Sequence, residues 1–149
     1  MSEIKHPIGL KTLFFTEMWE RMSFYGMRGI LVLFMTASIN NGGLDFSNAS
    51  ASAIYGIYAA AVYLMALPGG WLADNIFGQQ KTILFGGIVI MFGHLSLAVP
   101  NMTFFYLGLI LVVMGTGLLK PNISAIVGGL YEKNPSMKES GFTIFYMSI

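Results

Sequence analysis

Four long runs of apolar residues alternate with short polar segments along the chain. These runs cover residues 12–39, 49–73, 82–99 and 103–130. A fifth run begins near residue 140 and continues to Ile149. Each of the first four is close to the length of about 20 residues with which a helix crosses a bilayer. Because backbone groups inside a bilayer must be paired within the protein, the pattern predicts helices for all five runs.

The composition excludes an ordinary soluble domain. Hydrophobic residues make up 55% of the 149 residues and charged residues only 10%, whereas soluble domains have about 25% charged residues. We therefore expect an all-α membrane protein. The first run is too long and too charged for a cleavable signal peptide, so we interpret it as a permanent span.

Several other classes of function receive no support from the composition. The net charge of +1 gives no reason to expect nucleic acid as a partner. The chain has no cysteine, which excludes a disulfide framework, a thiolate metal site and a cysteine nucleophile. No motif indicates a metal site, a cofactor or the nucleophile–base pair of an enzyme, so we expect none of these.

The lysines between the runs predict how the chain is oriented. They lie before the first run, between the second and third, and between the fourth and fifth: Lys5, Lys11, Lys81, Lys133 and Lys138. The segments after the first and third runs contain no Lys or Arg. Because cytoplasmic loops carry the excess of basic residues, this alternation places the N-terminus in the cytoplasm.

Five ionisable residues lie inside the predicted spans, where each costs at least about 2.5 kcal/mol. They are Glu17, Glu20, Arg21, Arg28 and Lys120. Residues of this kind usually face one another or a water-filled cavity. Spacings of three and four put the four charged residues of the first run on one helical face, which also carries Phe24 and has Tyr25 on its edge.

Two interpretations of this charged stripe remain open. In the first it is a structural ion-pair cluster, in which Arg21 neutralises Glu17 one turn away. Glu20 and Arg28 then remain, together with Lys120 on another run. In the second its charges change during function. Buried ion pairs seldom add stability over apolar packing, so we favour the second interpretation.

The step from Lys120 to Pro121 is the next candidate for function. A proline inside a span often kinks the helix, and a lysine this far from the membrane surface is better placed to bind a carboxylate than to reach the headgroups. The glycines Gly69 and Gly70 allow close helix packing. With Asp74, which can cap a helix or pair across the cytoplasmic loop, Gly70 and Pro121 predict a scaffold or gating region.

Four further polar residues inside the runs have simpler interpretations. We expect His94 to form a hydrogen bond with a neighbouring helix rather than to carry protons. On the second run, Tyr63 is the deepest candidate for lining a cavity. We assign Tyr55 and Tyr58 to packing.

Four stretches of the chain resemble the proton-coupled oligopeptide transporters of the major facilitator superfamily. They are EMWERMSFYGMR from Glu17, GGWLADNIFGQQKTILFGGIVIMFG from Gly69, GTGLLKPN from Gly115 and FTIFYMSI from Phe142. The resemblance implies a fold of two six-helix bundles with substrate bound between them. Residues 1–149 would then form an incomplete N-terminal bundle, with helices 1–4 and the start of helix 5, and should not transport without the missing C-terminal bundle.

The resemblance also implies roles for individual residues. It assigns proton coupling to Glu17, Glu20 and Arg21. It assigns substrate binding to four residues with basic or phenolic side chains: Tyr25, Arg28, Tyr63 and Lys120. The implied partners are di- and tripeptides, protons and the lipid bilayer. All such peptides share two charged termini and backbone amides, and a basic cluster would bind the terminal carboxylate.

Two positions depart from the family pattern. Phe24 replaces a tyrosine that is common in the motif, and Gly56 stands where animal members carry a proton-binding histidine. The second departure favours a bacterial protein of the cytoplasmic (inner) membrane. The alternative within the superfamily is a transporter of nitrate-like anions or other small molecules, although such relatives often lose the Glu-x-x-Glu-Arg motif that is intact here.

Overall fold

The computed structural model describes residues 6–149 as a helical protein. Five α-helices are present in this part of the chain: α1 (Ile8–Thr36), α2 (Asn48–Leu72), α3 (Gln79–Leu97), α4 (Met102–Gly129) and α5 (Lys138–Tyr146). Shorter helical turns are η1 (Ile39–Asn41), the π-helical η2 (Ala73–Phe77) and η3 (Pro135–Met137). Lys5, one of the residues used to predict orientation, lies outside the described residues.

Local hydrogen bonds explain where the helices begin and end. The side chains of Ser47 and Asn101 cap the N-termini of α2 and α4, because they accept hydrogen bonds from backbone N–H groups of the first turn. The first helix ends at Thr36, three residues before its predicted end. The following loop folds back there, and the Leu44 and Phe46 N–H groups donate to carbonyls at the end of α1.

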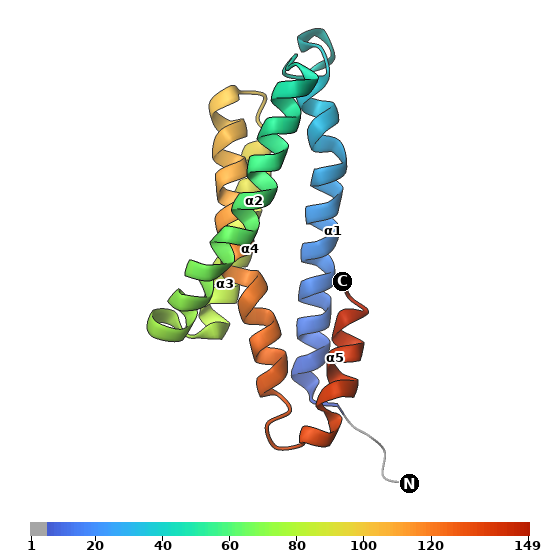
Figure 1. The fold of residues 1–149 in the computed structure, drawn as a ribbon, viewed down its shortest axis with the longest axis vertical. Coiled ribbons are helices and arrows are strands. Elements are labelled where there is room, and N and C mark those ends of the chain that lie inside the picture. Colours follow the sequence, from blue (N-terminus) through green and yellow to red (C-terminus); the bar gives the residue numbers. More distant parts are fainter. Residues whose placement is uncertain (1–5) are drawn as a thin grey trace.

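The helices are arranged as an up-and-down set (Figure 1). The connections from α2 to α3 and from α4 to α5 lie toward the end at which α1 begins, and the other two connections lie at the opposite end. Lys133 lies in the connection from α4 to α5, while Lys81 lies in the first turn of α3 and Lys138 is the first residue of α5. The arrangement therefore places these lysines at one end of the chain, as the predicted orientation requires.

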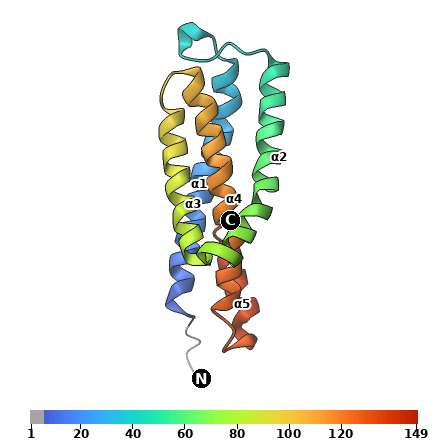
Figure 2. The ribbon, with the colours of Figure 1, turned by 90° about the vertical axis from the view of Figure 1, so that its left-hand side faces the viewer.

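Close contact between α3 and α4 depends on glycine. The two helices run side by side (Figure 2). A Cβ added at Gly86 would lie 2.8 Å from the Gly115 carbonyl oxygen, and one added at Gly93 would lie 3.1 Å from that of Gly108. Small residues that let backbones approach are typical of helix pairs in membranes.

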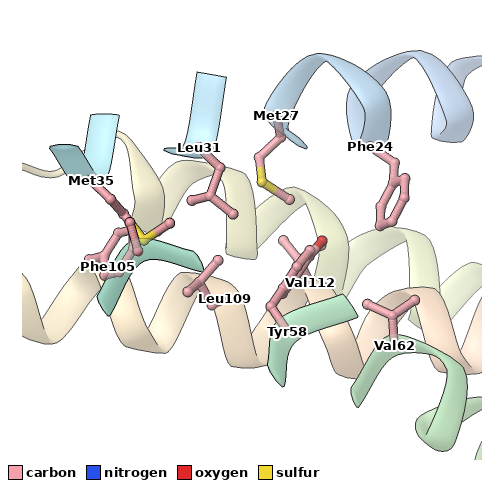
Figure 3. Close-up of a cluster of buried hydrophobic side chains, with 10 residues drawn as sticks. Phe24, Met27, Leu31, Met35, Tyr58, Val62, Phe105, Leu109 and Val112 are labelled. Atoms are coloured by element: carbon pink, nitrogen blue, oxygen red, sulfur yellow. The ribbon is translucent and has the colours of Figure 1, made fainter. Parts of the chain in front are cut away.

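Two apolar clusters form the core. The first joins α1, α2 and α4 and is shown in Figure 3, with Phe24 and Met27 on α1 and Tyr58 on α2. The second joins α1, α3, α4 and α5 around Ile123 and Tyr131. The Tyr131 hydroxyl lies 2.8 Å from His6 Nδ1. Burial raises the pKa of this phenol, which therefore stays protonated and can donate to the imidazole.

Three helices are long and apolar enough to cross a membrane by length and composition: Asn48–Phe77, Gln79–Leu97 and Met102–Gly129. The sequence predicted four complete spans, so these helices support three of them. The remaining predicted span corresponds to α1, whose middle contains Glu20, Arg21 and Arg28. That α1 also crosses the membrane stays a prediction.

Candidate functional site

A buried ion cluster lies in the middle of α1. Arg21 Nε lies 3.2 Å from Glu17 Oε1 and donates a hydrogen bond to Glu20 Oε2 at 2.5 Å. All three side chains are at most 7% exposed. Arg21 therefore pairs with Glu17 one turn away, as the first interpretation assumed, and the same guanidinium also serves Glu20.

The cluster is only partly satisfied within residues 6–149. Arg21 holds one oxygen of each carboxylate, while Glu17 Oε2 and Glu20 Oε1 are buried without a hydrogen-bond partner in the described part of the chain. Two acids sharing one base leave a net negative charge in the cluster. Buried acceptors without donors are costly, and a proton added to either acid would remove part of that cost.

Aromatic rings hold the two arginines of α1. The Arg21 guanidinium lies 5.2 Å from the centre of the Phe24 ring, and the Arg28 guanidinium lies 5.6 Å from the same ring. Cations at such distances are attracted to the face of an aromatic ring. Phe24 therefore stands between the buried ion cluster and Arg28, although it lacks the hydroxyl that is common at this position of the motif.

Arg28 is joined to α2 through a residue that the sequence did not single out. Its Nε donates a hydrogen bond to the Tyr55 hydroxyl at 2.6 Å, and its Nη2 contacts the same oxygen. The guanidinium also lies 5.1 Å from the centre of the Tyr55 ring. The assignment of Tyr55 to packing was therefore incomplete, because its hydroxyl fixes the position of Arg28.

Lys120 contacts Tyr63, the aromatic residue of α2 that was predicted to line a cavity. Its Nζ lies 5.0 Å from the centre of the Tyr63 ring. No carboxylate of the described residues lies within ion-pair distance of Lys120, but its charge acts at longer range on Glu17. The structure thus brings the predicted base and phenol together and leaves the ammonium available to an anion.

Exposure separates the predicted residues into two groups. Glu17, Glu20 and Arg21 are buried, whereas Tyr25 is 52% exposed and Tyr63 is 67% exposed. Arg28 and Lys120 are half-buried between these extremes. The arrangement consists of a covered ion cluster next to an open face with two cations and two phenols.

The crossing of α2 and α4 lies directly at Pro121. Proline has no N–H, so the Gly117 carbonyl lacks its usual helical donor. The Gly69 backbone packs so closely against this carbonyl that a Cβ at Gly69 would overlap its oxygen. Asn122 Nδ2 donates to the carbonyls of Leu118 at 2.6 Å and Gly69 at 3.3 Å, which ties the two helices together.

Of the other predicted scaffold residues, Gly70 lies at this crossing and Asp74 lies in the turn that follows α2. Gly70 faces Pro121, since a Cβ added there would lie 3.9 Å from the proline Cβ. Asp74 is exposed in the π-helical turn after α2 and forms no ion pair with residues 6–149. It lines a cavity between this turn and the end of α4, together with Lys81.

His94 bonds within its own helix. Its Nδ1 lies 2.9 Å from the Ile90 carbonyl oxygen one turn earlier on α3. The expected hydrogen bond to a neighbouring helix is therefore absent from the described part of the chain. Its Nε2 is buried without a partner there.

Comparison with known proteins shows that the chain is similar to a family of membrane transporters. Residues 80–149 match the model of the POT family. The chain is 53% identical to the uncharacterized transporter YclF of Bacillus subtilis, over 97% of this chain and 30% of the relative. It is 49% identical to a di-/tripeptide transporter of Lactococcus lactis, over 96% of this chain and 29% of the relative.

Two solved structures that resemble this chain are POT transporters. A peptide transporter POT in complex with sulfate superimposes with a TM-score of 0.93 at 48% identity, over 99% of this chain and 30% of that one. A POT family transporter in complex with 5-aminolevulinic acid superimposes with a TM-score of 0.94 at 41% identity. The match covers 99% of this chain and 30% of that transporter. The chain spans about 30% of the length of the relatives it matches. Nearly the whole chain is thus similar to the first part of POT family transporters, and residues 80–149 match the family model itself.

Proposed function

We propose that this chain belongs to the POT family and carries the proton-coupling and carboxylate-binding residues of a symporter that imports di- and tripeptides by alternating access. The observation that carries the proposal is the sharing of Arg21 between Glu17 and Glu20, next to an open face that presents Arg28 and Lys120. A structural cluster would need neither the unpaired acidic oxygens nor the unpaired ammonium.

The chemistry of the buried cluster fits proton coupling. Protonation of Glu20 would neutralise the carboxylate and weaken its hydrogen bond to Arg21. The guanidinium would then be free to change partners, and the relative energies of the inward-open and outward-open conformations would change with it. A proton gradient can drive uptake in this way when the two sides of the membrane load Glu20 to different extents.

The chemistry of the open face fits a peptide. Arg28 and Lys120 would bind the terminal carboxylate, which every di- and tripeptide carries. The exposed phenols of Tyr25 and Tyr63 would contact backbone amides, which are also common to all of them. The rest of the symporter, a second helical bundle, would close the opposite side of the substrate site.

The same proposal includes a location. Three helices have the length and composition of membrane spans, and the relatives described above are bacterial. We infer a multi-pass protein of the bacterial cytoplasmic membrane, with the lysine-containing connections on the cytoplasmic side.

The test is transport by the full-length protein in proteoliposomes. Uptake of labelled dialanine is measured with and without an inward proton gradient for wild type, Glu20→Gln and Glu132→Gln. Glu132 is an exposed acid after α4 and serves as the control. We expect wild type and Glu132→Gln to accumulate dialanine, and Glu20→Gln to keep only exchange of external for internal peptide.

Two results would contradict the proposal. If Glu20→Gln accumulates dialanine as wild type does, Glu20 does not couple protons. If dialanine neither moves nor competes under any gradient, the substrate is not a peptide. Nitrate or another anion bound by Arg28 and Lys120 would then be the next substrate to test.

A further inference from the structure

The hydroxyl of Tyr58 has no function in the mechanism so far, yet it lies buried in the core. The side chain is 3% exposed, and its ring is stacked with Phe24 at 6.3 Å between centroids. Figure 3 shows the hydroxyl pointing from α2 toward α1. No residue of the described chain forms a hydrogen bond with it. Packing explains the ring but not the oxygen, because phenylalanine would fill the same space.

Charged groups surround this hydroxyl. Arg28, Glu20, Tyr55 and Arg21 all act on it electrostatically. It lies one helical turn after Tyr55, which binds Arg28, and it stacks on the ring that both arginines of α1 contact. Tyr58 therefore lies close to both the ion cluster and Arg28.

An oxygen of Glu20, on the facing helix α1, is also buried without a partner in the described chain. Glu20 Oε2 accepts from Arg21, while Oε1 is buried and accepts from no donor in the described residues. Tyr58 provides a buried donor without an acceptor. The hydroxyl lacks an acceptor and the carboxylate oxygen lacks a donor. Both groups belong to helices that meet in the first apolar cluster.

The two groups are not hydrogen-bonded to each other in this structure. We propose that Tyr58 is a positioning residue for proton coupling, whose hydroxyl comes to donate to Glu20 Oε1 during the transport cycle while Arg21 holds Oε2. This inference rests on the proposed function. A hydrogen bond to the charged carboxylate makes Glu20 release its proton more easily. Tyr58 would thus set the pH at which Glu20 exchanges protons during transport.

The other groups that face this pair act from three helices. On α1 they are Glu17, Arg21 and Arg28, and on α2 the group is Tyr55. On α4, Lys120 acts on Glu17 rather than directly on the phenol. These groups remain unchanged when only the Tyr58 oxygen is removed, so the effect of that oxygen can be measured separately.

The test compares Tyr58→Phe with wild type in proteoliposomes. A membrane potential drives dialanine uptake at equal pH inside and outside, and the pH is varied in steps. Loss of one hydrogen bond to a charged group should move the pH of half-maximal uptake upward by about one unit. Exchange of dialanine should be retained, since the peptide-binding groups are intact.

Tyr106→Phe is the matched control. Tyr106 lies on α4 with a partly exposed ring that contacts Phe105. In the described residues, the hydrogen bonds and ion pairs of Glu17, Glu20 and Arg21 do not include it. The control should keep the wild-type pH profile. Adding Tyr58→Phe to Glu20→Gln should leave exchange at the level of Glu20→Gln alone, because the two groups act together.

Three results would overturn the proposal. The pH profile of Tyr58→Phe could coincide with that of wild type, with or without a lower unfolding temperature, which would assign Tyr58 to packing. The double variant could lose exchange that Glu20→Gln retains, which would show that the groups act independently. Failure of wild type to accumulate dialanine would instead overturn the proposed function and this inference with it.

Discussion

Arg28 on α1 and Tyr55 on α2 are joined by a hydrogen bond of 2.6 Å from the guanidinium Nε to the phenolic oxygen. The ring of the same tyrosine lies beneath the guanidinium. An arginine side chain has many conformations in solution, and two contacts with one tyrosine restrict them. Arg28 is thereby held ready at the edge of the open face before any substrate arrives.

We predict that Tyr55→Phe weakens peptide binding. The variant keeps the ring but loses the hydrogen bond, and bonds to charged groups contribute about 1.5–3 kcal/mol. The KM for dialanine should rise about tenfold or more, with a smaller change in kcat. Tyr146→Phe, at the exposed end of α5, should leave KM unchanged. An unaltered KM for Tyr55→Phe would mean that Arg28 does not depend on this bond.

A second prediction concerns the base that two acids share. Arg21→Gln would leave Glu17 and Glu20 buried without a cation, and such changes cost about 3–5 kcal/mol. Protons can neutralise the two carboxylates, so the variant should be most stable at low pH and lose stability as the pH rises. Thermal unfolding of the purified protein across a pH series measures this.

The matched control for Arg21→Gln is Lys11→Gln. Lys11 is an exposed base near the start of the same helix. It should unfold at the wild-type temperature at every pH. If the loss of stability in Arg21→Gln is the same at all pH values, the two carboxylates are not the cause of it.

The third prediction concerns the crossing of α2 and α4. Gly69→Ala would place a methyl group against the Gly117 carbonyl and force the helices apart. Overpacking of this kind costs about 1–3 kcal/mol, and the Asn122 bond to the Gly69 carbonyl would be stretched as well. The unfolding temperature should therefore fall.

Gly87→Ala provides the comparison for Gly69→Ala. A Cβ at Gly87 would have no neighbour within 4 Å, and Gly87 lies inside α3. Alanine favours a helix over glycine by about 1 kcal/mol, so this variant should be as stable as wild type or more stable. Equal unfolding temperatures for both variants would show that the close approach at Gly69 does not limit stability.

The sequence predicted those parts of the site that lie on one helix. Glu17, Glu20 and Arg21 were grouped by their spacing alone, and the helical geometry that joins them is local. The bond between Arg28 and Tyr55 crosses 27 positions of the sequence and depends on how two helices are rotated against each other. Apolar periodicity does not fix that rotation, so Tyr55 was indistinguishable from a packing residue.

The structure differs from the sequence analysis at two other residues, again because contacts between helices were unknown. Asn122 entered the sequence analysis only as the last residue of the GTGLLKPN stretch, although it supplies the hydrogen bonds that tie the α2–α4 crossing together. One ring nitrogen of His94 lies within hydrogen-bond distance of a backbone carbonyl of its own helix. The periodicity of the sequence cannot distinguish such a bond from one to another helix. Partners from other helices were thus the information missing from the sequence.

The position of Pro121 divides α4 into arms of unequal length. From Pro121, eight residues lead to Gly129 and nineteen lead back to Met102, so the arms measure about 12 Å and 28 Å. A bend of about 10° at this fulcrum would displace the short end by only about 2 Å and the long end by about 5 Å. The Gly69 contact lies close to Pro121, where α4 would move least. The two helices could therefore remain in contact while the ends of α4 move.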